Sequence, residues 1–207
     1  MPGNETTGGY LQIYQDLLKE LSKADLDWSG RRLGLHQNLS GEIEIPCLGK
    51  IFLISNTGLR HPEGTSPPSP LGSVLIHYLL KGNQGEPANQ FVKLEALASP
   101  VFKNNYSQGA LEFPLIKCFK GRVPELLAVA ESLGGRPGGE SGLGSVSLVF
   151  NLLPQIPIQL IFYDQDAEFP ARVTLLYDRN ATLFIEFEYL AVLATHFVQA
   201  LLKKQKT

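Results

Sequence analysis

The amino-acid sequence predicts an α+β fold in which several helices pack on an antiparallel sheet. Some stretches carry apolar residues at three- and four-residue steps, as helices do, and others are rich in alternating, β-branched and aromatic residues, as strands are. The two kinds of stretch occur in runs and not in strict alternation, which favours an antiparallel sheet. With 207 residues, of which 43% are hydrophobic and 18% charged, we expect a single α+β domain over residues 1–207, with its core at about 9–204.

The N-terminal half is expected to hold two helices, a hairpin and a long loop. An apolar stripe predicts a helix from Tyr10 to about Lys23. Alternating residues between Ser40 and Ser55 predict a β-hairpin, in which Pro46 favours an edge strand or a bulge because proline has no N–H to donate. Residues 56–70 hold many glycines and prolines and predict a long flexible loop. Helical spacing resumes over residues 71–81.

The C-terminal half is expected to hold two helices, a three-stranded antiparallel meander and a long final helix. Glycine-rich residues 134–144 predict a second long flexible loop between the helices and the meander. The final helix carries Leu190, Leu193, Phe197 and Leu201 on one face, which we expect to cover the sheet. We expect that sheet to be continuous with, or adjacent to, the hairpin. The predicted segments are a short strand at 90–94, helices at 110–120 and 124–133, strands at 146–150, 158–163 and 172–177, and the final helix at 186–203.

Charge and cysteine content exclude several classes of function. Eighteen basic and 20 acidic residues give a net charge of −2, so nucleic-acid binding is disfavoured. Cys47 and Cys118 are the only cysteines and neither belongs to a C-x-x-C pair, so we predict no iron–sulfur cluster in this chain and no intrinsic cofactor. The start of the sequence lacks the pattern of a secretory signal and no stretch reaches 18 apolar residues, which predicts a soluble, cytoplasmic protein without membrane association.

An acidic segment is the candidate metal site. Asp164, Asp166 and Glu168 lie two positions apart, so an extended backbone would point their carboxylates in one direction. Mg²⁺ and Ca²⁺ prefer such oxygen ligands. The alternative interpretation is an exposed acidic turn between two strands, whose charges stay in water. The glycine of an EF-hand loop and a neighbouring histidine are both missing, which favours the alternative.

The long loop at 56–70 carries the candidate contacts for a ligand or a partner. Arg60, His61 and Glu63 lie close together there, and functional groups are disproportionately carried on loops. The alternative is a structural or solvated role for each side chain, because one titratable loop residue does not define a site. His77 falls within a predicted helix and is interpreted as a helix-surface or core-edge side chain.

Four short segments form a pattern along the chain, namely Gly9–Leu11 with the sequence GYL, 153–157 with LPQIP, 163–171 with YDQDAEFPA, and 176–178 with LYD. With these segments the chain resembles an uncharacterised prokaryotic family, domain of unknown function 3786, over about residues 9–202. The resemblance implies an accessory protein of anaerobic prokaryotes, in the neighbourhood of corrinoid or one-carbon metabolism, and some members carry an added iron–sulfur domain. Because this chain lacks the cysteines for a cluster, the cluster would belong to a partner.

Three hypotheses of function follow from these observations. The first is a non-catalytic binding or accessory module that works with a protein or cofactor-bearing partner, since no complete catalytic constellation is visible. The second is a small divalent-metal-dependent enzyme that uses Asp164, Asp166 and Glu168. The third is a structural protein-interaction domain whose long loop and exposed hairpin edge contact another chain. A concave pocket that joins the carboxylates to a histidine would favour the second hypothesis, and an exposed apolar patch the third.

Overall fold

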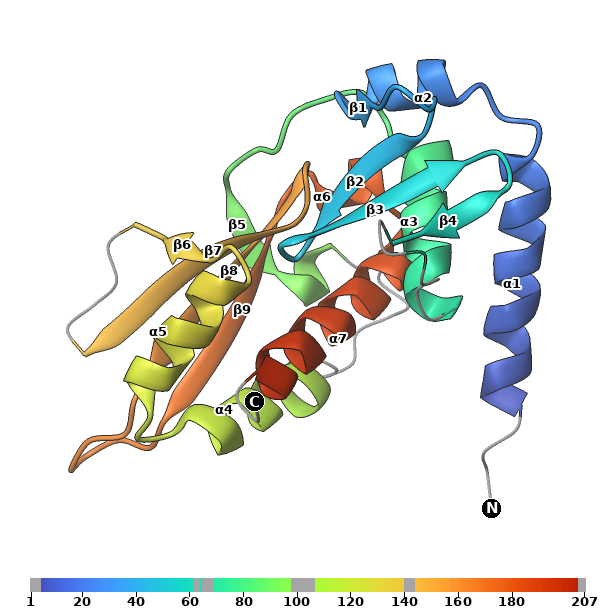
Figure 1. Ribbon diagram of the computed structural model, residues 1–207. Coiled ribbons are helices and arrows are strands. Elements are labelled where there is room, and N and C mark those ends of the chain that lie inside the picture. Colours follow the sequence, from blue (N-terminus) through green and yellow to red (C-terminus); the bar gives the residue numbers. More distant parts are fainter. Residues whose placement is uncertain (1–4, 62–63, 65–68, 98–106, 140–143, 205–207) are drawn as a thin grey trace. The chain divides into compact units, whose positions relative to one another are not determined.

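The computed structural model describes residues 5–61, 64, 69–97, 107–139 and 144–204 (Figure 1). The described residues form helices and two antiparallel sheets, which confirms the α+β class. The chain divides into two compact units. The first unit comprises Met1–Glu86 and Thr182–Leu193, and the second comprises Pro87–Ala181 and Ala194–Thr207.

The first unit is built on a four-stranded antiparallel sheet. Its strands are β1 (His36–Gln37), β2 (Ile43–Cys47), β3 (Lys50–Ser55) and β4 (Gly58–Arg60), in that spatial order. Strands β2 and β3 form the predicted hairpin. Its two-residue turn consists of Leu48 and Gly49, both with positive φ (50° and 73°), as a type I′ turn requires. The fully buried Ile43, Ile45 and Ile54 form the core face of the sheet.

The helices of the first unit are α1 (Glu5–Leu21), α2 (Leu26–Arg32), α3 (Ser69–Lys81), most of α6 (Ala181–Phe184) and the first part of α7 (Phe187–Lys204). Helix α1 packs along α3 (Figure 1). The two approach closely at Gly72, where an added Cβ would lie 2.6 Å from the ring of Tyr14. Arg32 caps the end of α3, because its Nη2 donates to the carbonyl oxygens of Leu79 and Leu80 at 2.9 and 3.0 Å.

Two local predictions in the first unit were wrong. Residues 56–70, expected as one loop, contain β4 and the start of α3. Strand β4 has only three residues and begins with a glycine, so it carries no strand pattern in the sequence. The strand forms because these residues pair with β3. Pro46 was expected on an edge strand or at a bulge, but β2 lies between β1 and β3 and pairs with β3 without a register shift. Strand β1 pairs only with Ile43 and Glu44, so Pro46 lies beyond the stretch that is paired on both sides.

The second unit is built on a five-stranded antiparallel sheet. The spatial order is β5 (Phe91–Lys93), β9 (Arg172–Asp178), β8 (Ile156–Tyr163), β7 (Ser145–Leu153) and β6 (Arg136–Pro137). Strands β7, β8 and β9 are the predicted meander. The meander is not continuous with the hairpin, because the short strands β5 and β6 occupy the two edges and the hairpin belongs to the other sheet. The other alternative, a sheet adjacent to the hairpin, stays a prediction. Strand β6 also lies inside the predicted loop at 134–144.

The remaining helices of the second unit are the 3-10 helix η1 (Leu94–Ala96), the π-helical segment η3 (Ser107–Glu112), α4 (Phe113–Phe119), α5 (Val123–Ser132) and the rest of α7. The final helix uses the predicted face, since the side chains of Phe197 and Leu201 are fully buried. The ring of Phe197 meets that of Phe150 on β7 edge to face, with the ring centroids 4.8 Å apart. This contact packs the second part of α7 on the sheet of the second unit.

A buried carboxylate secures the connection to β5. Asp178 is fully buried at the end of β9. Its carboxylate accepts hydrogen bonds from the backbone N–H groups of Ala88, Asn89 and Asn180, at 2.9, 2.6 and 2.8 Å. These bonds hold Asn89 in the left-handed region (φ 53°), which asparagine tolerates better than most residues. The carboxylate is therefore satisfied by the backbone and is assigned a structural role.

We expect Phe197→Ala to destabilise the protein by about 3 to 5 kcal/mol, because it leaves a cavity beneath a fully buried ring. Phe169→Ala is the matched control, since the side chain of Phe169 is 66% exposed and its truncation should change stability by less than about 0.5 kcal/mol. Urea unfolding of the parent and both variants measures the difference. A Phe197→Ala midpoint equal to that of the parent would contradict the packing described here.

Candidate functional site: a braced turn that displays Leu39

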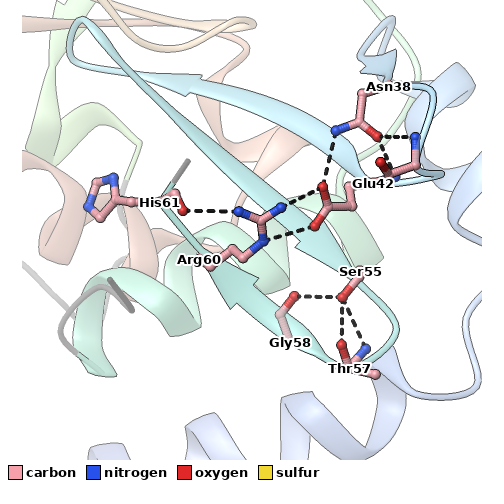
Figure 2. Close-up of polar contacts among 8 residues, drawn as sticks. Asn38, Glu42, Ser55, Thr57, Gly58, Arg60 and His61 are labelled. Carbon is pink, nitrogen blue, oxygen red and sulfur yellow. Dashed lines mark hydrogen bonds and ion pairs between the residues drawn. The ribbon is translucent and has the colours of Figure 1, made fainter. Parts of the chain in front are cut away.

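The predicted loop residue Arg60 is the last residue of β4, and its guanidinium binds Glu42 in the loop before β2 (Figure 2). Nε of Arg60 donates to Oε1 of Glu42 at 3.0 Å, and Nη2 donates to Oε2 at 2.9 Å. The two bonds form a bidentate pair, the strongest geometry for these groups. The side chain of Glu42 is only 12% exposed and that of Arg60 is 44% exposed, so the pair is partly shielded from water.

Asn38 links the ion pair to the backbone of the turn between β1 and β2 (Figure 2). Its Nδ2 donates to Oε2 of Glu42 at 3.1 Å. Its Oδ1 accepts from the backbone N–H groups of Ser40 and Glu42, both at 3.0 Å. Asparagine is favoured at this position because its side chain can replace a backbone acceptor in a turn. Every polar atom of the Asn38 side chain is thus used to hold the turn.

The backbone closes the same turn with further hydrogen bonds. The N–H of Gly41 donates to the carbonyl of Asn38, and the N–H of Asn38 donates to the carbonyl of Glu42, both at 2.9 Å. Gly41 has φ +80° and is therefore in the left-handed region. A left-handed residue at the end of the turn is typical of a three-residue hairpin connection. Gln37 adds a bond from its Nε2 to the carbonyl of Gly41 at 2.9 Å. We call residues 38–42 the braced turn.

The tip of the braced turn displays an apolar side chain. Leu39 is fully exposed, although turn tips favour glycine, proline, asparagine, aspartate and serine. A leucine in water contributes nothing to the stability of the folded chain, whereas its burial against another surface would contribute about 1.5 to 3 kcal/mol. Trp28 of α2, a helix that contacts β1, is also 55% exposed. The guanidinium of Arg32 lies 4.4 Å from the centre of the Trp28 ring and holds it in place.

The other two candidates from the predicted loop do not join Arg60 in one site. The imidazole of His61 points away from the ion pair and packs against the ring of Phe52, with ring centroids 4.3 Å apart (Figure 2). Only the backbone carbonyl of His61 meets Arg60, accepting from Nη1 at 3.4 Å. Glu63 lies outside the described residues. Asn38, Leu39 and Glu42 were missed by the sequence analysis, although an asparagine three positions before Gly41 is a turn signal.

Two carboxylates of the acidic segment, those of Asp164 and Asp166, accept hydrogen bonds from backbone N–H groups. Oδ1 of Asp164 accepts from the N–H groups of Gly121 and Gln165, both at 2.8 Å. Oδ1 of Asp166 accepts from Phe169 and Glu168, and these two bonds lower the pKa of Asp166. Among the described residues, no group of three or more histidine, cysteine, aspartate or glutamate side chains is arranged to hold a metal ion. The metal site stays a prediction.

Calorimetric titration with Mg²⁺, Mn²⁺ and Ca²⁺ tests that prediction. If the carboxylates bind a cation, the heat should be saturable, and Asp166→Asn should remove it, because the substitution removes one charged oxygen ligand. Asp27→Asn is a control for nonspecific attraction to surface carboxylates, since Asp27 pairs with Arg31 on α2. The absence of heat with all three cations would contradict a metal role for this segment.

The thiol of Cys47 in the first unit is not reactive at neutral pH. Cys47 is buried, and burial raises the pKa of its thiol to about 12. The thiol therefore stays protonated at neutral pH and is not an activated nucleophile.

We expect Arg60→Gln to destabilise the protein by about 1 to 3 kcal/mol, because it leaves the largely buried carboxylate of Glu42 without its cation. The matched control is Arg31→Gln, which breaks an exposed pair with Asp27 one helical turn away and should change stability by less than about 0.5 kcal/mol. Urea unfolding measures both variants. Equal midpoints for the two variants would show that the braced turn does not depend on Arg60.

Comparison with known proteins identifies a family. The family model described as domain of unknown function 3786 matches residues 25–200, a range that includes α2, both sheets and the braced turn. No curated protein and no solved structure is significantly similar to the chain. Among the helices that the structure describes, none is long and apolar enough to cross a membrane.

Proposed function

We propose that this chain, which belongs to the family of domain of unknown function 3786, is a non-catalytic binding module that acts through a protein partner. The observation that carries the proposal is Leu39, a fully exposed leucine on a turn whose backbone and side chains are held by Asn38, Glu42 and Arg60. A turn that is already ordered loses little conformational entropy on binding, so burial of the leucine contributes directly to affinity.

The same unit supplies a second preformed contact. Trp28 is exposed and is held by the guanidinium of Arg32, whose Nη2 is itself bound to the end of α3. Tryptophan is enriched among the residues that dominate binding energy at protein interfaces. A leucine and a tryptophan on ordered elements suit a partner with apolar pockets on its surface. These two side chains offer no charged or nucleophilic group that would bind or transform a small substrate, which favours a protein ligand.

The identity of the partner is proposed from the family resemblance. That resemblance supports an accessory role in corrinoid, one-carbon or iron–sulfur metabolism of anaerobic prokaryotes, in which the partner holds any cluster. Cys47 and Cys118 are not joined in a disulfide, which suits a reducing compartment such as the cytoplasm. We therefore propose that the module binds its partner in the cytoplasm.

We expect Leu39→Asp to weaken the partner complex by at least about 30-fold, because an anchor at the centre of an interface is worth about 2 kcal/mol or more. The experiment is native mass spectrometry of the full chain purified from its own host cells, followed by titration of the retained subunit. Leu183→Asp is the matched control, since Leu183 is also an exposed leucine of the first unit (49%) and lies outside the braced turn.

Two results bear on the proposal. The parent and the Leu183→Asp variant should retain one subunit in fixed stoichiometry, and the Leu39→Asp variant should lose it while keeping the urea midpoint of the parent. A parent chain that is isolated without any bound protein, or a Leu39→Asp variant that binds as tightly as the parent, would contradict it.

A further inference from the structure

A second polar cluster lies within the first unit, where α3 meets the start of α7. His77 of α3 is buried, with 5% of its surface exposed. Its imidazole stacks on the ring of Tyr189 of α7, with ring centroids 4.2 Å apart and an interplanar angle of 27°. Its Nε2 lies 3.4 Å from Oε1 of Glu186. Glu186 directly precedes α7, and its backbone carbonyl accepts a hydrogen bond from the N–H of Leu190 at 3.0 Å.

The second ring nitrogen of His77, Nδ1, is buried and lacks a hydrogen-bond partner among the described residues. Because Glu186 is an acceptor, the neutral ring carries its proton on Nε2, and Nδ1 is left as a bare acceptor. Protonation of Nδ1 would create a buried N–H group without an acceptor, which is unfavourable. The site therefore accommodates the neutral imidazole and not the imidazolium.

The charges that face the imidazole come from three helical segments. Glu20 of α1 and Lys81 of α3 form an ion pair, with Nζ 2.5 Å from Oε2. Glu186 and Glu20 favour a positive charge on His77, whereas Lys81 opposes it. Burial outweighs the two carboxylates and lowers the pKa of His77. Burial and the carboxylates of Glu186 and Glu20 raise the pKa of Tyr189, so its hydroxyl stays neutral beside the ring.

We propose that His77, Glu186 and Tyr189 form an acid-sensitive latch, which holds the first turn of α7 on α3 while the imidazole is neutral and releases it on protonation. The latch is independent of the braced turn and of the proposed partner. Its direction follows from linkage. The folded-state pKa of His77 lies below the ordinary value of about 6.5, so the opened state takes up the proton first. The stability of the closed latch is complete above that value and is lost as the pH falls below it.

Amide hydrogen exchange at Leu190, whose N–H closes the first turn of α7 on the carbonyl of Glu186, measures the opening of the latch. After correction for intrinsic exchange rates, protection in the parent should fall by up to about tenfold between pH 7.5 and pH 5.5, because tenfold is the factor that an opened histidine with a pKa of about 6.5 gains over the interval when the closed state takes up no proton. His77→Gln should show equal protection at the two pH values. His36→Gln, which removes an exposed histidine beside Glu44, should behave as the parent does.

Equal protection at both pH values in the parent, or a loss in His77→Gln as large as that in the parent, would overturn the proposal. If His77→Gln does not fold, the parent alone decides the question. An NMR titration of the ring protons of His77 should give a pKa below 6.5, with opening of α7 at the same pH. A measured value at or above 6.5 would also overturn the latch.

Discussion

The bidentate pair between Arg60 and Glu42 is the interaction on which the braced turn of the first unit depends. It ties the outer strand β4 to the start of β2, and Asn38 extends the same hydrogen-bonded network into the turn beyond β1. Because Glu42 is largely buried, its charge is tolerated only with the guanidinium in place. The hydrogen bonds that satisfy this carboxylate also fix the backbone around Leu39. Folding of the sheet therefore also holds the exposed side chain of Leu39 in place.

Three polar groups with little or no exposure to water show how their hydrogen-bond partners decide their roles. Asp178 receives three backbone N–H groups and joins two segments of the second unit. Glu42 receives a guanidinium and an amide, and its network braces a turn. His77 has one ring nitrogen beside a carboxylate and the other without a partner in the described part of the chain. A group that is satisfied in only one protonation state responds to pH, whereas a fully satisfied group supplies rigidity.

Regular elements with a strong period were predictable from the sequence, and the contacts of the candidate site were not. The meander of β7, β8 and β9 and the buried face of α7 follow from residue spacing, because each such element must bury one side. Strand β4 has three residues and exists only through its pairing with β3. Arg60 was selected because it lies on a loop rich in glycine and proline, yet its partner Glu42 lies 18 positions earlier, and no local pattern connects the two.

The sequence by itself determined the class of the fold, the hairpin, the meander, the long final helix and the family, since composition and period are properties of the chain alone. Tertiary structure decided that the strands form two sheets, that Arg60 binds Glu42 while His61 packs on Phe52, and that His77 is buried against Tyr189. The physical reason is that strand pairing, burial and the partner of a charged group depend on which distant segments meet in space, and local propensity carries no information about that.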